Sequence, residues 1–274
     1  MTKQLDDNDI AWLNEYASSV TDTFSEKFGE NSDRFKEGSQ LVERFNASIA
    51  EVKKRGRKYF RAVDEAHNEL CIALALLENK EPRFLKICYE PPLANTEKTI
   101  DFYAEAQNGV VVYVDVKTIT PMAKDRWEQY ERALQEGWFP KDVAFTVDKE
   151  WLGGELWHDA FTARGRILEY TLELEQKIAQ SKLSVDENVF VLALCGEGFH
   201  WHQDELEDFV AFYRAGQHRV DDPFSLAEDK YIKEQGLLIS HDVSRFACLR
   251  RPLGDLFHKR LNWNVQLPAD PTFY

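Results

Sequence analysis

The sequence predicts an α/β protein in which helices come first and a small set of strands follows. Two apolar stripes with helical spacing lie within the first sixty residues. A hairpin pattern surrounds Gln107-Asn108-Gly109, and a continuous apolar strand is expected at residues 189–195. With 274 residues, 43% hydrophobic and 30% charged, the chain is long enough to bury a substantial core, and wholesale disorder is excluded.

Three helices are predicted ahead of the strands. The first two each carry an apolar stripe along one face, and the third covers residues 62–78, which include the apolar run 70–77. The stripes consist of Trp12, Tyr16, Val20 and Phe24, and of Leu41, Phe45, Ile49 and Val52.

Three strands are predicted next. Residues 84–89 are short and apolar and are followed by Pro91-Pro92. Residues 99–106 and 110–119 flank the turn Gln107-Asn108-Gly109, which indicates an antiparallel hairpin.

The pattern then returns to helices. Helical spacing is expected at residues 125–135 and 161–181, before the buried strand 189–195 and a helix at 204–214. No repeat or Pro/Gly/Ser-rich linker divides the chain. We therefore expect a helical N-terminal extension (1–61), a mixed α/β core (62–216) and a C-terminal extension packed on that core (217–274).

The net charge of −14 and the pI near 5.0 argue against non-specific coating of nucleic acid, which depends on Lys and Arg. A local basic run between residues 53 and 61 nevertheless offers a place for a phosphate backbone, although a solvated helix face explains it equally well. The run consists of Lys53, Lys54, Arg55, Arg57, Lys58 and Arg61.

The chain shows neither a secretory signal nor a run of roughly 20 apolar residues that could span a bilayer. Its four cysteines are scattered and form no CxxC pair, which favours reduced thiols. We expect a cytoplasmic protein without a membrane partner.

The hairpin carries the most informative residues. Asp115 and Lys117 alternate with Val114 and Val116, so they point to the same face of their strand. A carboxylate in an apolar strand is costly to bury unless it is paired or bound to a metal.

The position of Asp101 depends on the length of the turn. A two-residue loop would place Asp101 opposite Val116. A three-residue loop with Gly109 in the left-handed conformation pairs residues whose numbers sum to 216, and Asp101 then faces Asp115. We predict the three-residue loop, because two carboxylates that face each other are explained by a cation between them.

Asp101 and Asp115-Val116-Lys117 resemble the signature of the PD-(D/E)XK nuclease superfamily, which has the restriction-endonuclease-like fold. The predicted order of helix, three antiparallel strands, helix and strand is similar to that family's core. The resemblance covers residues 62–214, and Ile100 stands where the family has its eponymous proline. An acidic-x-Lys triplet is common by itself, since Glu175-Gln176-Lys177 is another.

The resemblance implies a nuclease that hydrolyses phosphodiester bonds, in DNA ahead of RNA, with Mg²⁺ or Mn²⁺ as the cofactor. Metal ligands would come from two carboxylates, one main-chain carbonyl and a glutamate of the first core helix. Lys117 would orient or help to deprotonate the attacking water, and its pKa should fall beside the metal. The implied ligands are Asp101, Asp115, Val116 and Glu69, with Glu65 as the alternative helix residue and Glu90 as a further candidate.

Other interpretations remain open. The same fold without catalysis would make an interaction module for nucleic acid or protein. His200-Trp201-His202-Gln203-Asp204 has the H-x-H-x-D spacing of a metal site, although Asp204 also fits a helix N-cap. A homodimer is compatible with the sequence, since the terminal regions lie outside the resemblance.

Overall fold

The computed structural model describes six segments of the chain, and every structural statement below refers to them. They are residues 5–56, 60–119, 164–197, 203–215, 239–251 and 272–273.

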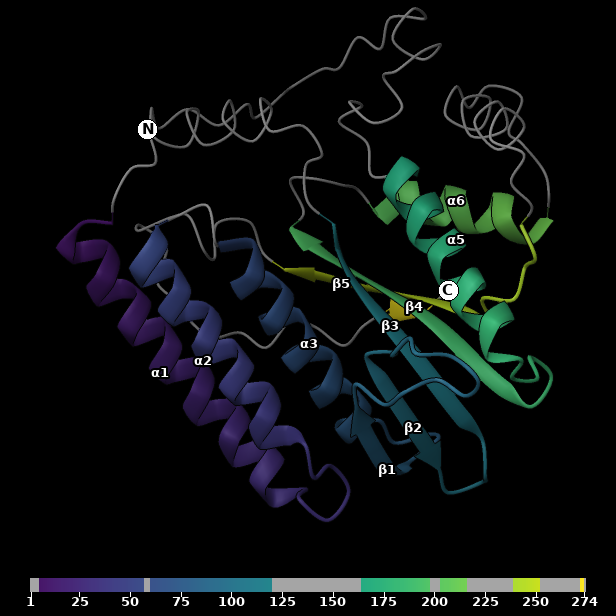
Figure 1. The fold of residues 1–274 in the computed structure, drawn as a ribbon, viewed down its shortest axis with the longest axis horizontal. Coiled ribbons are helices and arrows are strands. Elements are labelled where there is room, and N and C mark those ends of the chain that lie inside the picture. Colours follow the sequence, from purple (N-terminus) through teal and green to yellow (C-terminus); the bar gives the residue numbers. More distant parts are fainter. Residues whose placement is uncertain are drawn as a thin grey trace, which may run out of the picture.

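Three long helices open the fold and lie side by side (Figure 1). They are α1 (Asp7–Glu30), α2 (Gly38–Arg55) and α3 (Phe60–Glu78), which confirms the three predicted helices. A capping box between Asp6 and Asp9 starts α1, because each side chain accepts the other residue's backbone N–H. The predicted stripes face the protein interior, and all their residues are buried except Trp12, which packs against the core from its edge.

A mixed six-stranded sheet follows, with its strands in sequence order. β1 to β3 form an antiparallel meander, β4 pairs in parallel with β3, β5 pairs in parallel with β4, and β6 is antiparallel to β5. The strands are β1 (Phe84–Tyr89), β2 (Phe102–Ala106), β3 (Val111–Ile119), β4 (Asn188–Glu197), β5 (Arg245–Arg251) and β6 (Thr272–Phe273). The predicted α/β class is confirmed.

The last two strands were not predicted. β5 contains only four apolar or small residues between arginines, so its sequence shows a basic cluster more clearly than a strand. In the structure, Phe246 and Ala247 are buried on opposite faces of the sheet, and this alternation is what makes the segment a strand.

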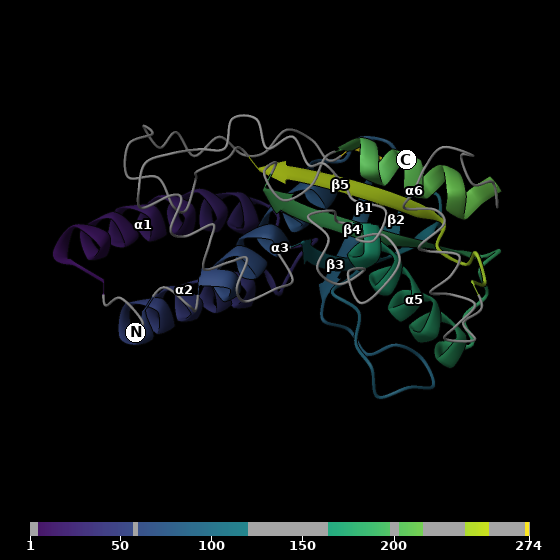
Figure 2. The ribbon, with the colours of Figure 1, turned by 90° about the horizontal axis from the view of Figure 1, so that it is seen from above.

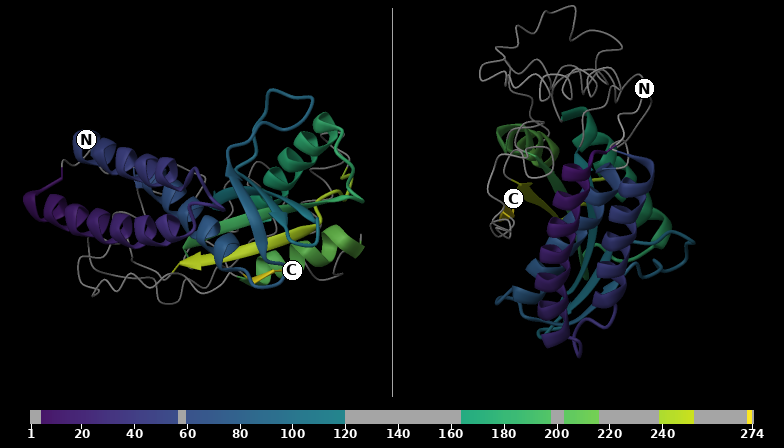
Figure 3. Two further views of the ribbon diagram at one scale, coloured as in Figure 1. Left: turned by 90° about the horizontal axis from the view of Figure 1, so that it is seen from below. Right: turned by 90° about the vertical axis from the view of Figure 1, so that its left-hand side faces the viewer.

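The sheet separates two hydrophobic cores. Figures 2 and 3 show the sheet and its helices from three sides. α1 to α3 cover one face, while α5 (Arg164–Ser181) and α6 (Gln203–Ala215) cover the other. β4 is apolar on both faces because it contributes to both cores. Val191, Ala193 and Cys195 face the first core, and Phe190, Leu192 and Leu194 face the second.

The hairpin has the predicted three-residue turn. Phe102 pairs with Val114 and Glu105 with Val111, so paired residue numbers sum to 216. Gly109 has φ +82°, a left-handed conformation that favours glycine. The prediction of loop length and register is confirmed.

The predicted helix at residues 125–135 lies outside the described residues, as do the first residues of the helix predicted from 161 onward.

α1 and α2 share a core with α3 and the first three strands. Within the six described segments, no helix is both long and apolar enough to cross a membrane.

Candidate active site

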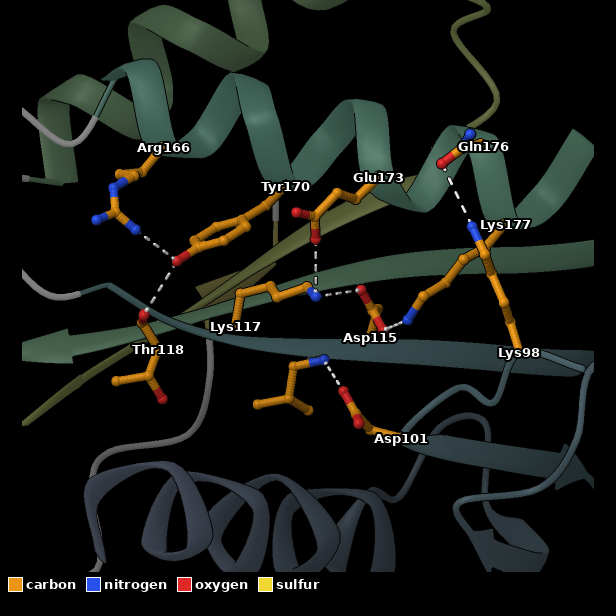
Figure 4. Close-up of polar contacts among 11 residues, drawn as sticks. Lys98, Asp101, Asp115, Lys117, Thr118, Arg166, Tyr170, Glu173, Gln176 and Lys177 are labelled. Atoms are coloured by element: carbon orange, nitrogen blue, oxygen red, sulfur yellow. Dashed lines mark hydrogen bonds and ion pairs between the residues drawn. The ribbon is translucent and has the colours of Figure 1, made fainter. Parts of the chain in front are cut away.

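Asp115 is a buried carboxylate on β3 that faces α5 (Figure 4). Its side chain is 1% exposed, and Lys177 Nζ lies 2.6 Å from its Oδ1. Lys117 Nζ lies 3.4 Å from Oδ2, within ion-pair distance but without a hydrogen bond. One oxygen of Asp115 is therefore held by α5, while the other accepts no hydrogen bond from the described part of the chain.

The face of α5 that covers β3 is polar along its length. Arg166, Tyr170, Glu173 and Lys177 are spaced by four, three and four residues, so they lie on the same side of the helix. Glu173 binds Lys117 Nζ at 3.0 Å, and Tyr170 presents its ring to the same ammonium, 5.5 Å from the ring centre. Helix α5 thus fixes the position of Lys117 as well as that of Asp115.

Asp101 lies just before β2, beside the backbone of the opposite strand. The Val116 N–H donates to its Oδ2 at 2.5 Å. Burial, and then the negative charge of Asp115, raise the pKa of Asp101 to about 6, against the lowering effect of that hydrogen bond and of the two lysines. The charge of Asp115 is therefore close enough to oppose ionisation of Asp101.

The charges of the protein raise the pKa of Lys117, whereas the sequence predicted that a bound metal would lower it. Burial lowers the pKa of this ammonium, but the charge of Asp115 and the hydrogen bond to Glu173 outweigh burial and raise it above its usual value. These residues hold Lys117 as a cation.

Glu69 belongs to a neighbouring cluster on the α2–α3 side of the sheet. Its Oε2 accepts from Arg44 Nη1 at 2.5 Å and from the Tyr89 hydroxyl at 2.7 Å. Arg44 also contacts Tyr89 and lies 3.4 Å from Glu90. The pKa of Glu69 is raised to about 7. Burial is the largest cause, the charge of Asp101 adds to it, and the charge of Arg44 opposes both.

The structure therefore places the predicted residues in two adjoining groups. Asp101, Asp115 and Lys117 come together on the hairpin, whereas the carboxylate of Glu69 is bound to Arg44. Glu69 as a metal ligand remains a prediction. Its alternative Glu65 binds Arg61 at 2.7 Å on the surface of α3, and Glu90 is half exposed, with its backbone N–H donating to the Asp101 carbonyl at 2.9 Å.

The donor set can be compared with the needs of a divalent cation. Over the residues that the structure describes, no three His, Cys, Asp or Glu side chains are grouped so that they could hold a metal ion by themselves. Mg²⁺, however, is usually bound by one or two carboxylates together with waters and substrate phosphates. Asp101, Asp115 and the Val116 carbonyl fit that open kind of site, and the Asp115 oxygen without a hydrogen bond is an available ligand atom.

The predicted basic run joins α2 to α3. Lys53, Lys54 and Arg55 occupy the last turn of α2, and Arg61 lies in the first turn of α3. Lys53 binds Asn14 at 2.6 Å and Arg55 binds Glu51 at 2.7 Å, while Lys54 is exposed. Arg57 and Lys58 lie outside the described residues.

His200 and His202 also lie outside the described residues. α6 begins at Gln203, so Asp204 lies inside the helix and the N-cap interpretation of this residue is wrong.

Sequence reasoning missed Lys177, Glu173 and Arg44. Lys177 was visible only within the triplet Glu175-Gln176-Lys177, and no local pattern shows which strand a helical side chain will meet. The available signal was the helical spacing that puts Glu173 and Lys177 on the same side of α5.

Comparison with known proteins adds no relative: no family model matches the chain, and neither do the curated proteins or the solved structures.

Proposed function

We propose that the protein is a divalent-metal-dependent nuclease that hydrolyses phosphodiester bonds, with DNA expected as substrate ahead of RNA. One observation carries the proposal. The hairpin register brings Asp101 beside Asp115 and Lys117, with the Asp115 side chain buried and the other two partly buried. Buried acidic groups with perturbed pKa values are typical of functional sites.

The topology supports the same proposal. An antiparallel meander followed by a parallel β4, with α3 on one face and α5 on the other, has the order of a restriction-endonuclease-like core. The acidic-x-Lys triplet lies on the strand at which parallel pairing begins. We infer membership of the PD-(D/E)XK superfamily from these two features together.

The residues would divide the chemistry as follows. Asp101, Asp115 and the Val116 carbonyl would hold Mg²⁺ or Mn²⁺, which polarises a phosphodiester and lowers the pKa of a bound water. Because Asp115 and Glu173 keep Lys117 protonated, its ammonium orients the water and offsets negative charge in the transition state, rather than removing a proton.

Substrate binding has to be local, because the chain carries a net charge of −14. The end of α2 and the start of α3 supply positive charge in the described part of the basic run, at Lys53, Lys54, Arg55 and Arg61. We propose that this surface, with Arg57 and Lys58 between its two parts, contacts the phosphate backbone.

The test is to incubate labelled single- and double-stranded DNA and RNA with Mg²⁺ or Mn²⁺. We expect cleavage by the wild type and a loss of at least 100-fold, on the order of one lost acid–base or electrostatic group, in Asp115→Asn and Lys117→Met. Glu105→Gln and Lys86→Met change the same charges at exposed positions of β2 and β1 and should cleave normally. Cleavage that survives in both site variants would reject this active site.

One observation favours a second candidate. Asp115 already has two lysines as neighbours, a state in which the site is electrically balanced without a metal. An inactive nuclease-like module that binds nucleic acid or protein would have such a site. For such a module, the Asp115→Asn variant would bind nucleic acid as well as the wild type does, and the wild type would cleave no nucleic acid with any divalent metal.

A further inference from the structure

Lys177 makes the closest contact with the buried carboxylate of the site. Its Nζ lies 2.6 Å from Asp115 Oδ1, whereas Lys117 Nζ lies 3.4 Å from Oδ2 (Figure 4). Lys177 comes from α5, 62 positions along the chain from Asp115, so this contact forms only when the helix packs on the sheet. Lys177 is not part of the acidic-x-Lys triplet Asp115-Val116-Lys117, on which the proposed chemistry rests.

The two lysines differ in how their charges are balanced. Lys117 is shared between Asp115 and Glu173, with the Glu173 contact at 3.0 Å. Within the described segments, Lys177 is paired with Asp115 alone. A divalent cation on Asp115 would therefore compete with Lys177 for the one ion-pair partner that this lysine has within the described segments, while Lys117 would keep Glu173.

A cation and the Lys177 ammonium cannot both lie close to one carboxylate without repulsion. Two positive centres within a few ångströms repel appreciably even at the effective dielectric constant of a protein surface. The lysine has a flexible four-carbon stem, and its side chain is 18% exposed, so its ammonium can move toward water.

We propose that Lys177 is a positioning residue that serves as the counter-ion of Asp115 in the cation-free protein and releases Asp115 when a divalent cation binds. The inference rests on the proposed function, because it takes Asp115 as a ligand of that cation. Lys177 pairs with the buried carboxylate and holds its orientation, at the expense of affinity for the cation.

The experiment is calorimetric titration of Mn²⁺ into the full chain and into Lys177→Met. We expect the variant to bind Mn²⁺ about tenfold more tightly, since a repelling unit charge has been removed. Its melting temperature in EDTA should be lower than that of the wild type, because Asp115 has lost its nearest counter-ion. A residue with only a structural role would lower stability without raising Mn²⁺ affinity.

Two controls make the result specific, and a second neutral variant covers a failure to fold. Lys98→Met removes a lysine that contacts Gln176, the neighbour of Lys177 on α5, and should bind Mn²⁺ as the wild type does. Lys177→Arg retains the charge and should also match the wild type. If Lys177→Met does not fold, Lys177→Gln removes the charge but keeps a hydrogen-bond donor, and the same tenfold gain is expected.

The outcomes separate this inference from the proposed function. If Asp115→Asn loses Mn²⁺ binding while neither neutral variant of Lys177 binds more tightly, the role of Lys177 is rejected and the metal site stands. If Asp115→Asn binds Mn²⁺ as well as the wild type, the metal site is rejected and the role of Lys177 falls with it.

Discussion

The candidate site is built from charges that the protein has removed from water and then balanced across elements. Asp115 is neutralised by lysines of its own strand and of α5, and Asp101 is held by a backbone N–H. Removing one partner from such an arrangement leaves an uncompensated buried charge, which is far costlier than losing a surface pair. Stability and chemistry at this site are therefore linked through the same few residues.

Asp101→Asn should stabilise the cation-free protein at neutral pH. The pKa of Asp101 is raised to about 6 in the folded chain, so the native state binds a proton more readily than the unfolded state does. The stability that this proton provides is complete below about pH 4 and is lost as pH rises through 6. Asparagine lacks this ionisation, so the variant should be more stable by about 2–3 kcal/mol at pH 7.5 and equal to the wild type near pH 4.

Urea unfolding in EDTA across this pH range measures that difference. Asp186→Asn, at an exposed position before β4, is the matched control and should follow the wild type throughout. A stability difference that stays constant from pH 4 to pH 7.5 would show that Asp101 ionises normally.

The sequence predicted the hairpin residues of the site and missed those of the helices. Turn chemistry at Gly109 determined the register, and the register determined that Asp101 lies beside Asp115, so both steps were local. Lys177 and Arg44 reach their partners through the packing of elements far apart in the chain. No spacing rule predicts such contacts, because they depend on which faces of two elements meet.

At the scale of elements, the β2–β3 turn determines whether the site forms. Gly109 has φ +82°, and a Cβ added to it would meet no atom within 4 Å. Backbone conformation alone thus determines the effect of a substitution. Gly109→Ala should lower the free energy of unfolding by about 1 kcal/mol, and Gly109→Asn by less, because asparagine tolerates the left-handed region.

Gly29 provides the comparison for this prediction. A Cβ there also meets nothing within 4 Å, but Gly29 lies in α1 and its φ is not positive. Gly29→Ala should therefore leave stability unchanged or raise it by up to about 1 kcal/mol in chemical denaturation. Equal effects at the two glycines would contradict the role of the turn.

Arg44 ties α2 to α3 and β1 through Glu69 and Tyr89. Because the pKa of Glu69 is about 7, its carboxylate is ionised at pH 8 and protonated at pH 5. Arg44→Met should therefore cost about 1–2 kcal/mol at pH 8, reduced by the partial exposure of Arg44, and less at pH 5.

Thermal unfolding at the two pH values tests this prediction. Arg61→Met breaks the exposed pair with Glu65 on α3 and should cost less than about 0.5 kcal/mol at either pH. If Arg44→Met is no more harmful at pH 8 than at pH 5, the ionised pair with Glu69 contributes nothing to the fold.

At the scale of the whole molecule, the sheet lies between two hydrophobic cores. A further buried carboxylate, Glu175, links the elements of the core formed with α5 and α6. Glu175 on α5 accepts from the Tyr213 hydroxyl of α6 at 2.6 Å and from the N–H groups of Ser240 and His241, at 3.0 and 2.8 Å. Three elements thus meet at one carboxylate on the helix that also carries Lys177.

Glu175→Ala should destabilise the protein by about 2–3 kcal/mol, because its donors lose their acceptor in a partly buried place. Glu175→Gln keeps one acceptor oxygen and should cost about half as much. Urea denaturation measures both, with Gln180→Ala on the exposed side of α5 as the neutral control. Stability of Glu175→Ala equal to that of the control would mean that water replaces the carboxylate without loss.

The α/β class and the order of its elements could be predicted, because helical stripes and the β4 apolar run follow from periodicity. β5 could not be predicted, since arginines begin and end it and its buried residues, Phe246 and Ala247, are covered by the two cores on opposite faces of the sheet. The sharing of one core by α1, α2 and the sheet is likewise a property of packing.

The most direct test of the account is to locate Mn²⁺ by anomalous scattering in crystals of the wild-type protein. The account predicts a peak within bonding distance of carboxylate oxygens of both Asp101 and Asp115, and no such peak in Asp115→Asn. A peak bound instead by His200 and His202, or no peak at the hairpin at high Mn²⁺, would contradict it.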